Sequence, residues 1–83
     1  MVKVEIFSGP QCTYCEQAKA LLTQNDIPYI DYDISQTEHM QEFARRLPRL
    51  RAIPQIFIND GHIGNEEDLK IMAQDGRLEA LIG

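Results

Sequence analysis

The sequence contains no apolar stretch that approaches the roughly 20 residues of a membrane-spanning helix. Residues 1–5 also lack the long apolar core and the cleavage site of a secretory signal peptide. Basic residues are few: the sequence has eight Lys and Arg but thirteen Asp and Glu, which gives a formal net charge of −5. This balance disfavours nonspecific binding to DNA, RNA or anionic membranes. We therefore expect a cytoplasmic protein that binds neither nucleic acid nor membranes.

Cysteine is scarce as well, because Cys12 and Cys15 are the only two in the chain. A disulfide between residues so close in sequence closes a very short loop, which stabilises a fold little through chain entropy. The 83 residues, 43% of them hydrophobic, are enough for one small domain, 1–83, to fold without such a crosslink. The pair is therefore better explained by redox chemistry in a reducing compartment than by a structural role.

The hydrophobic spacing switches several times between the period of a strand and the period of a helix. Asn59-Asp60-Gly61 is typical of a tight hairpin turn, Asn65 with Asp68 of a helix start, and Gly76 of a helix end. The expected strands are 2–7, 29–34, 55–58 and 62–64, and the expected helices are 13–25, 36–47, 65–76 and a short piece over 78–82.

The second expected helix carries two further signals. Ser35 and Glu38 have the spacing of a capping box, so we expect Ser35 to cap this helix. Met40, Phe43 and Leu47 recur at helical spacing, and we expect this stripe to pack in the core.

The element order is β-α-β-α-β-β-α, which predicts an α/β fold. The first two strands are joined by a helix, so we expect them to be parallel with a right-handed crossover. The last two are joined by a tight turn and should form an antiparallel hairpin. The sequence therefore predicts one mixed four-stranded sheet flanked by helices on both faces.

The cysteine pair falls where the first strand gives way to the first helix. Residues i and i+3 share a helix face, so Cys15 continues the apolar stripe of Ala18 and Leu22. Cys12 falls at the helix start, where unpaired N–H groups and the positive end of the helix dipole favour a thiolate. We therefore predict that Cys12 attacks disulfides and that Cys15 resolves the mixed disulfide.

Two other uses of the cysteines are open. A zinc site would need two more ligands, and His39 and His62 lie much further apart than typical paired histidine ligands. We therefore expect no metal site, and we expect His62 to be a structural or surface residue. Two inert cysteines are the other alternative, although a Cys-x-x-Cys pair on a strand–helix unit is typical of redox proteins.

Two further features suggest a ligand. Ile53-Pro54 opens the third strand, where a proline is tolerated in the common trans form; a cis bond would turn the Ile53 backbone outward, toward an extended thiol peptide. Charge gathers in two clusters, which are either solvated surface or the two ends of a site for a small zwitterionic ligand. The clusters are Arg45, Arg46, Arg49 and Arg51, and Asp60, Glu66, Glu67 and Asp68.

These motifs together resemble a dithiol glutaredoxin of bacterial type. The resemblance rests on 12–15 after a strand, on 53–58, and on 62–64 before an acidic helix start, and it covers nearly the whole chain. It implies a thioredoxin-like fold, a cis bond before Pro54, and glutathione as the reducing cosubstrate. The implied function is a monomeric glutathione-dependent oxidoreductase that reduces protein disulfides and glutathione mixed disulfides.

The resemblance also implies a glutathione site with three parts. A tyrosine and a basic residue lie near the glycine end, the backbone before the proline pairs with the cysteinyl unit, and the start of the last helix meets the γ-glutamyl end. The matching residues are Tyr14, Arg51, Ile53, Pro54, Asn65, Glu66 and Glu67, with Arg49 a second candidate for the basic residue.

Two alternatives to this function stay open. One is a redoxin reduced by thioredoxin reductase, although the aromatic-rich C-terminal signature associated with that type is missing. The other is a carrier of a [2Fe–2S] cluster bridged between two chains by the first cysteine and glutathione. The family's proline after the first cysteine is thought to disfavour such a cluster, and Thr13 stands in its place.

Overall fold

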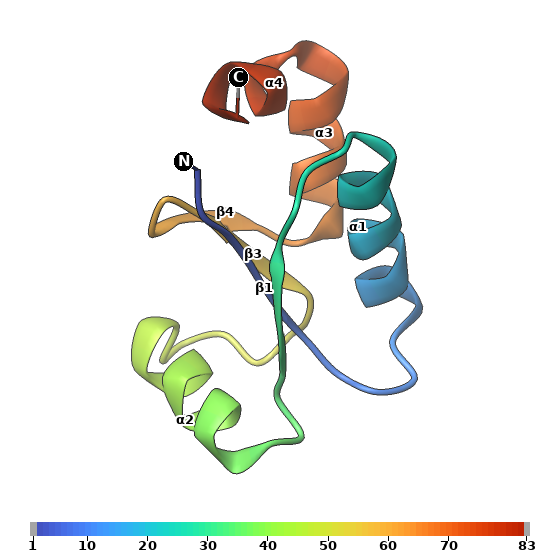
Figure 1. Ribbon diagram of the computed structural model, residues 1–83. Coiled ribbons are helices and arrows are strands. Elements are labelled where there is room, and N and C mark those ends of the chain that lie inside the picture. The colour runs from blue at the N-terminus through green and yellow to red at the C-terminus, as the bar shows by residue number, and fades with distance from the viewer. Residues whose placement is uncertain (1, 83) are drawn as a thin grey trace.

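The computed structural model describes residues 2–82. Four strands form one sheet in the order β2-β1-β3-β4, in which β1 and β2 are parallel and the other neighbours antiparallel. The predicted mixed sheet is confirmed, and helices cover both of its faces (Figure 1). Within the described chain, no helix is long and apolar enough to cross a membrane. The elements are β1 (Val4–Ser8), α1 (Thr13–Gln24), β2 (Ile30–Asp33), α2 (Thr37–Arg46), β3 (Gln55–Ile58), β4 (Gly61–Gly64), α3 (Glu66–Asp75) and α4 (Arg77–Ile82).

The two central strands, β1 and β3, are buried along their whole length because each of their faces packs against helices. On one face, Ile6 and Ile56 pack with aliphatic residues of α1, α3 and α4. On the other face, Phe7 and Phe57 pack with Phe43 of α2. In Figure 1, α1 and α3 accordingly lie together on one side of the sheet and α2 on the other.

The face under α2 also contains a buried ion pair. Glu5 is 1% exposed, and its carboxylate accepts two hydrogen bonds of 3.1 Å from the Arg46 guanidinium and one of 2.8 Å from the Tyr32 hydroxyl. The guanidinium lies over the rings of Phe7 and Phe57. Hydrogen bonds from Arg46 hold the pKa of Glu5 below its usual value. Arg46 is therefore part of the core and not of a solvated basic cluster.

The start of α2 differs from the prediction. Ser35 is not the cap, because its N–H donates to Asp33 Oδ1 (2.9 Å) in a turn that precedes the helix. Gln36 is the N-cap, and its side chain makes no capping hydrogen bond.

The buried face of α2 also differs from the predicted stripe. Met40 is 43% exposed, whereas Phe43 is buried and Leu47 half-buried. His39 contacts the sheet in place of Met40, with its ring 5.1 Å from that of Tyr32. The inward face is therefore rotated by one residue in this first turn.

The predicted signals after β3 are confirmed. Asn59 and Asp60 have φ values of 50° and 68°, which suits a tight hairpin turn. The Asn65 side chain accepts from the N–H groups of Glu67 and Asp68, and Asp68 accepts from the N–H of Asn65 in return.

The end of α3 depends on Gly76, which has a φ of 86°. A Cβ built at this position meets no atom within 4 Å, so the cost of a side chain is purely conformational. We expect Gly76→Ala to lower the free energy of unfolding by about 1 kcal/mol, because only glycine adopts this left-handed geometry freely. Gly76→Asn should lose less, because asparagine tolerates this geometry. Urea unfolding of the three proteins measures both values, and equal stability of wild type and Gly76→Ala would contradict the argument.

Candidate active site

Three loops meet at one edge of the sheet because of the strand register. Phe7, near the end of β1, lies opposite Gln55 at the start of β3. Gly64, the last residue of β4, lies opposite Ile56. The segments attached at these points are the loop before α1, the loop before β3, and the start of α3. The fold therefore gathers the cysteine pair, the proline motif and the acidic helix start, although they are far apart in sequence.

The cysteines have different environments. Cys12 is the N-cap of α1 and half-buried, whereas Cys15 is 0% exposed. A disulfide joins the two, whose Cα atoms lie 5.2 Å apart. The backbone N–H of Cys15 donates to Cys12 Sγ at 3.2 Å. Because the first N–H groups of a helix have no partner within it, this donor is available to a Cys12 thiolate when the disulfide is reduced.

The Ile53–Pro54 peptide bond is cis, as the resemblance implied. Pro54 is buried and Ile53 half-buried. Ile53 packs against Gly9, in the loop that leads to the cysteines. The approach is so close that a Cβ added at Gly9 would lie 2.9 Å from Ile53 Cδ1. The proline motif and the cysteine loop are therefore in direct contact.

The basic cluster divides into two pairs. Arg45 and Arg46 both bind Glu42, and Arg46 also binds Glu5. Arg49 and Arg51 are exposed and take part in none of the ion pairs found within residues 2–82. Of the four arginines, this second pair is the one that makes no ion pair within residues 2–82, which favours it as the partner of an anionic ligand. Tyr14, on the first turn of α1, is 59% exposed.

The acidic cluster divides in the same way. Asp60 binds Lys3 at 2.8 Å, and Asp68 is used in the cap of α3. The side-chain oxygen of Asn65 is used in that cap as well. This leaves the half-buried Glu66 and the exposed Glu67.

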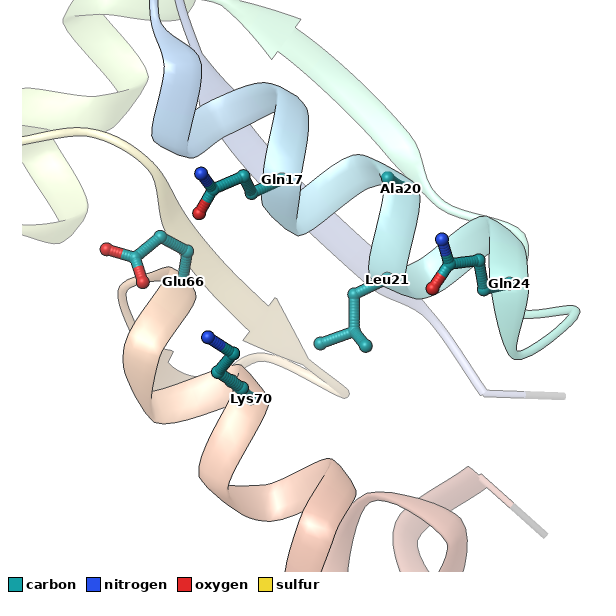
Figure 2. A pocket seen from close by; sticks show the side chains of 6 residues that line it. All are labelled: Gln17, Ala20, Leu21, Gln24, Glu66 and Lys70. Atoms are coloured by element: carbon teal, nitrogen blue, oxygen red, sulfur yellow. The ribbon is translucent and has the colours of Figure 1, made fainter.

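Glu66 lies at one end of a hollow of about 300 Å³ between α1 and α3. Figure 2 shows Glu66 on α3 and Gln17 on α1 at the same end of this gap, with Lys70 one turn further along α3. The hollow is lined by Gln17, Ala20, Leu21, Gln24, Glu66 and Lys70.

One polar contact beside the proline motif is absent from the sequence-based prediction. Gln55 is 5% exposed, and its side chain bridges Ala52 and His62. The signal in the sequence is a polar residue at the start of an otherwise apolar strand. Its partners could not be inferred, because they are set by the loop and by the hairpin.

Comparison with known proteins gives a consistent result. Residues 4–63 match the family model of glutaredoxin. The chain is 37% identical over 84 residues to the glutaredoxin of Neisseria meningitidis serogroup A, covering 99% of this chain and 98% of that relative. The solution structure of glutaredoxin from Brucella melitensis is 38% identical with a TM-score of 0.80, covering 98% and 88% of the two chains. The crystal structure of a buckwheat glutaredoxin–glutathione complex is 25% identical with a TM-score of 0.83, covering 96% and 76%.

Proposed function

The chain belongs to the glutaredoxin family and is a glutathione-dependent thiol–disulfide oxidoreductase, and we propose that Cys12 is its nucleophile and Cys15 its resolving thiol. One observation supports this assignment most strongly. Cys12 is accessible and accepts a hydrogen bond from the Cys15 N–H, whereas the Cys15 sulfur is fully buried. Incoming disulfides therefore reach only Cys12, and the hydrogen bond stabilises the thiolate that attacks them.

The proposed reaction begins with attack of the Cys12 thiolate on one sulfur of the substrate disulfide. This forms a mixed disulfide and expels the other sulfur as a thiolate, which takes up a proton. Cys15 then loses its proton and attacks the Cys12 sulfur, which releases the second substrate thiol and leaves the Cys12–Cys15 disulfide. The two electrons gained by the substrate come from the two protein thiols.

Glutathione returns the protein to its reduced form. One glutathione thiolate attacks Cys12, frees Cys15 as a thiol, and forms a protein–glutathione mixed disulfide. A second glutathione attacks the glutathione sulfur of this intermediate, releasing the Cys12 thiolate and one glutathione disulfide. Where the substrate is itself a glutathione mixed disulfide, the Cys12 thiolate attacks its glutathione sulfur and forms the same protein–glutathione intermediate. The last step then completes the reaction without Cys15.

The proposed glutathione site lies along the edge where the three loops meet. Its glycine end is placed at Tyr14 and Arg51, with Arg49 as the alternative, because these two arginines are exposed and make no ion pair among residues 2–82. The cysteinyl unit is placed along the backbone of Ile53, before the cis bond to Pro54.

The γ-glutamyl end is placed at the start of α3. Its carboxylate can accept from helix N–H groups, and its ammonium group can pair with Glu66 or Glu67. Asn65 contributes by holding this helix start rather than through its side-chain oxygen, which already caps α3.

Substitution of the two free arginines tests the glycine end. We expect Arg51→Gln to raise the KM for glutathione by up to about fivefold, the range of one exposed ion pair, and to lose this effect in high salt. Arg49→Gln is the matched control, with the same change two residues away. A larger effect of Arg49→Gln would transfer the role to Arg49, and no effect of either would contradict this end of the site.

The source of electrons distinguishes a protein that is reduced by glutathione from one that is reduced by thioredoxin reductase. Oxidation of NADPH is measured with hydroxyethyl disulfide, either with glutathione and glutathione reductase or with thioredoxin reductase alone. We expect turnover only in the first system. Turnover with thioredoxin reductase alone would favour the alternative redoxin.

A [2Fe–2S] carrier is a second candidate, favoured by one observation: the residue after Cys12 is Thr13, which is exposed and not a proline. The thiolate of Cys12 is a suitable soft ligand. However, residues 2–82 contain no group of three or more His, Cys, Asp or Glu that could hold a metal ion, so two chains and two glutathione molecules would have to share the cluster. Anaerobic reconstitution with iron, sulfide and glutathione tests this, and a colourless protein would exclude the role.

We also propose that the protein acts as a monomer in the cytoplasm on disulfide-containing proteins. The cysteine pair suits a reducing compartment, and the net charge of −5 suits a freely diffusing protein. Light scattering of the reduced protein, with and without glutathione, measures the oligomeric state.

A further inference from the structure

The side chain of Gln55 connects the hairpin to the loop before β3. Gln55 Nε2 lies 3.0 Å from the carbonyl oxygen of Ala52, and Gln55 Oε1 lies 2.8 Å from Nε2 of His62. The His62 ring lies against the ring of Phe57, with 5.2 Å between the ring centroids. A continuous set of contacts therefore runs from the sheet, through His62 and Gln55, to the loop.

The direction of each hydrogen bond follows from the chemistry of the groups. A carbonyl oxygen only accepts, so the amide nitrogen of Gln55 must be the atom that faces Ala52. The amide oxygen then faces His62 and requires a donor, so His62 must have a proton on Nε2. Both the neutral Nε2–H form and the imidazolium satisfy this requirement.

Few other hydrogen bonds hold the loop, although Ile53 also makes apolar contacts. Among the hydrogen bonds found in residues 2–82, the backbone of 49–54 makes only one other, from the Leu50 N–H to the carbonyl oxygen of Leu47. Ala52 lies between Arg51 and Ile53, which the proposed function places against glutathione. The bond from Gln55 therefore fixes the backbone between these two contacts.

We propose that His62 and Gln55 are positioning residues that hold the loop 49–53 in the conformation that binds glutathione. The proposal rests on the glutathione site described above. His62 touches neither Cys12 nor the ligand in this account; it orients Gln55, and Gln55 holds the carbonyl of Ala52. This gives His62 a functional use beyond the structural or surface role expected from the sequence.

Two substitutions of His62 separate the hydrogen bond from the ring contact. His62→Phe keeps a ring against Phe57 but has no donor for Gln55. His62→Gln loses the ring, but its amide nitrogen reaches about as far from the backbone as Nε2 of histidine and can donate to Gln55. If the ring contact with Phe57 were the important one, the two variants would rank in the opposite order.

The steady-state test uses reduced protein, hydroxyethyl disulfide, glutathione and glutathione reductase. We expect His62→Phe to raise the KM for glutathione about three- to tenfold with little change in kcat, which is the usual range for one lost hydrogen bond. His62→Gln should stay within about twofold of wild type. An unchanged KM in His62→Phe, or an equal rise in both variants, would overturn the proposal.

A measurement without glutathione distinguishes this proposal from the proposed function. Backbone ¹⁵N order parameters of Arg51 and Ala52 should fall in reduced His62→Phe and stay at the wild-type value in His62→Gln. Should wild type show no glutathione-dependent turnover, the proposed function fails, and the order parameters still decide whether the pair holds the loop. Unchanged order parameters in His62→Phe overturn the proposal whatever the activity.

Gln55→Glu provides an independent test of the proposal if His62→Phe does not fold. The carboxylate keeps an acceptor for His62 but has no donor for the Ala52 carbonyl. We expect it to show the same rise in KM and the same loss of order at Arg51 and Ala52 as His62→Phe. Wild-type values for both quantities would overturn the proposal.

Discussion

Glutathione-dependent reduction of hydroxyethyl disulfide is expected to fall to the rate of the reaction without protein in Cys12→Ser. A serine hydroxyl is not ionised at neutral pH and cannot form a disulfide. The variant therefore can neither attack the substrate disulfide nor form the mixed disulfide with glutathione. The burial of Cys15 means that the second thiol cannot take over. The measurement is NADPH oxidation coupled through glutathione reductase.

Cys15→Ser is the matched control, because it removes the other sulfur of the same pair. We expect it to stay within about tenfold of wild type on this substrate, since glutathione itself attacks the mixed disulfide on Cys12. On a protein disulfide that needs intramolecular resolution, the same variant should lose most of its activity. Full activity of Cys12→Ser, or equal loss in both variants, would contradict the assigned roles.

Arg46→Ala should lower the free energy of unfolding by about 3–5 kcal/mol, because it leaves the Glu5 carboxylate buried without its partner. Arg45→Ala is the matched control on the same helix. Arg45 is exposed, and among residues 2–82 its one ion pair is with Glu42, so its loss should cost less than about 1 kcal/mol. Urea unfolding at neutral pH measures both values. Similar losses in the two variants would show that the buried pair contributes little.

The same pair predicts how stability depends on pH. The folded-state pKa of Glu5 is lowered by hydrogen bonds from Arg46, so its contribution is present above the usual pKa of glutamate and is lost as pH falls through the lowered value. Without Arg46, burial should raise the pKa of Glu5. Protonation of Glu5 would then remove the buried charge and reduce the loss of stability in the variant. The stability difference between wild type and Arg46→Ala should therefore be largest at neutral pH. It should begin to narrow above the usual pKa of glutamate, where Glu5 of the variant takes up its proton, and should narrow further as pH falls through the lowered pKa of Glu5 in the wild type. A difference that is constant with pH would contradict this explanation.

Local sequence rules predicted most of the fold. Gly76 and the turn at 59–61 were recognised because glycine, asparagine and aspartate tolerate backbone geometries that other residues avoid. The rules failed in the first turn of α2. The predicted stripe began at Met40, whereas in the fold His39 takes the inward position and packs against Tyr32, a contact that local spacing does not reveal.

The candidate site was less predictable because it depends on contacts between distant residues. The cysteine pair could be found from its spacing alone. The charge clusters could not be sorted from sequence, because Glu5 and Arg46 are 41 positions apart and only the fold brings them together. The bridge from His62 to Ala52 depends in the same way on the hairpin register.

The contact between Gly9 and Ile53 constrains how this site can vary in evolution. A side chain at position 9 would meet the terminal methyl group of Ile53 at 2.9 Å, which is closer than non-bonded carbon atoms approach. A side chain at position 9 therefore requires this methyl group to turn away, or to be absent as it is in valine. A lysine introduced at position 9 to add positive charge beside the cysteines would be best combined with Ile53→Val.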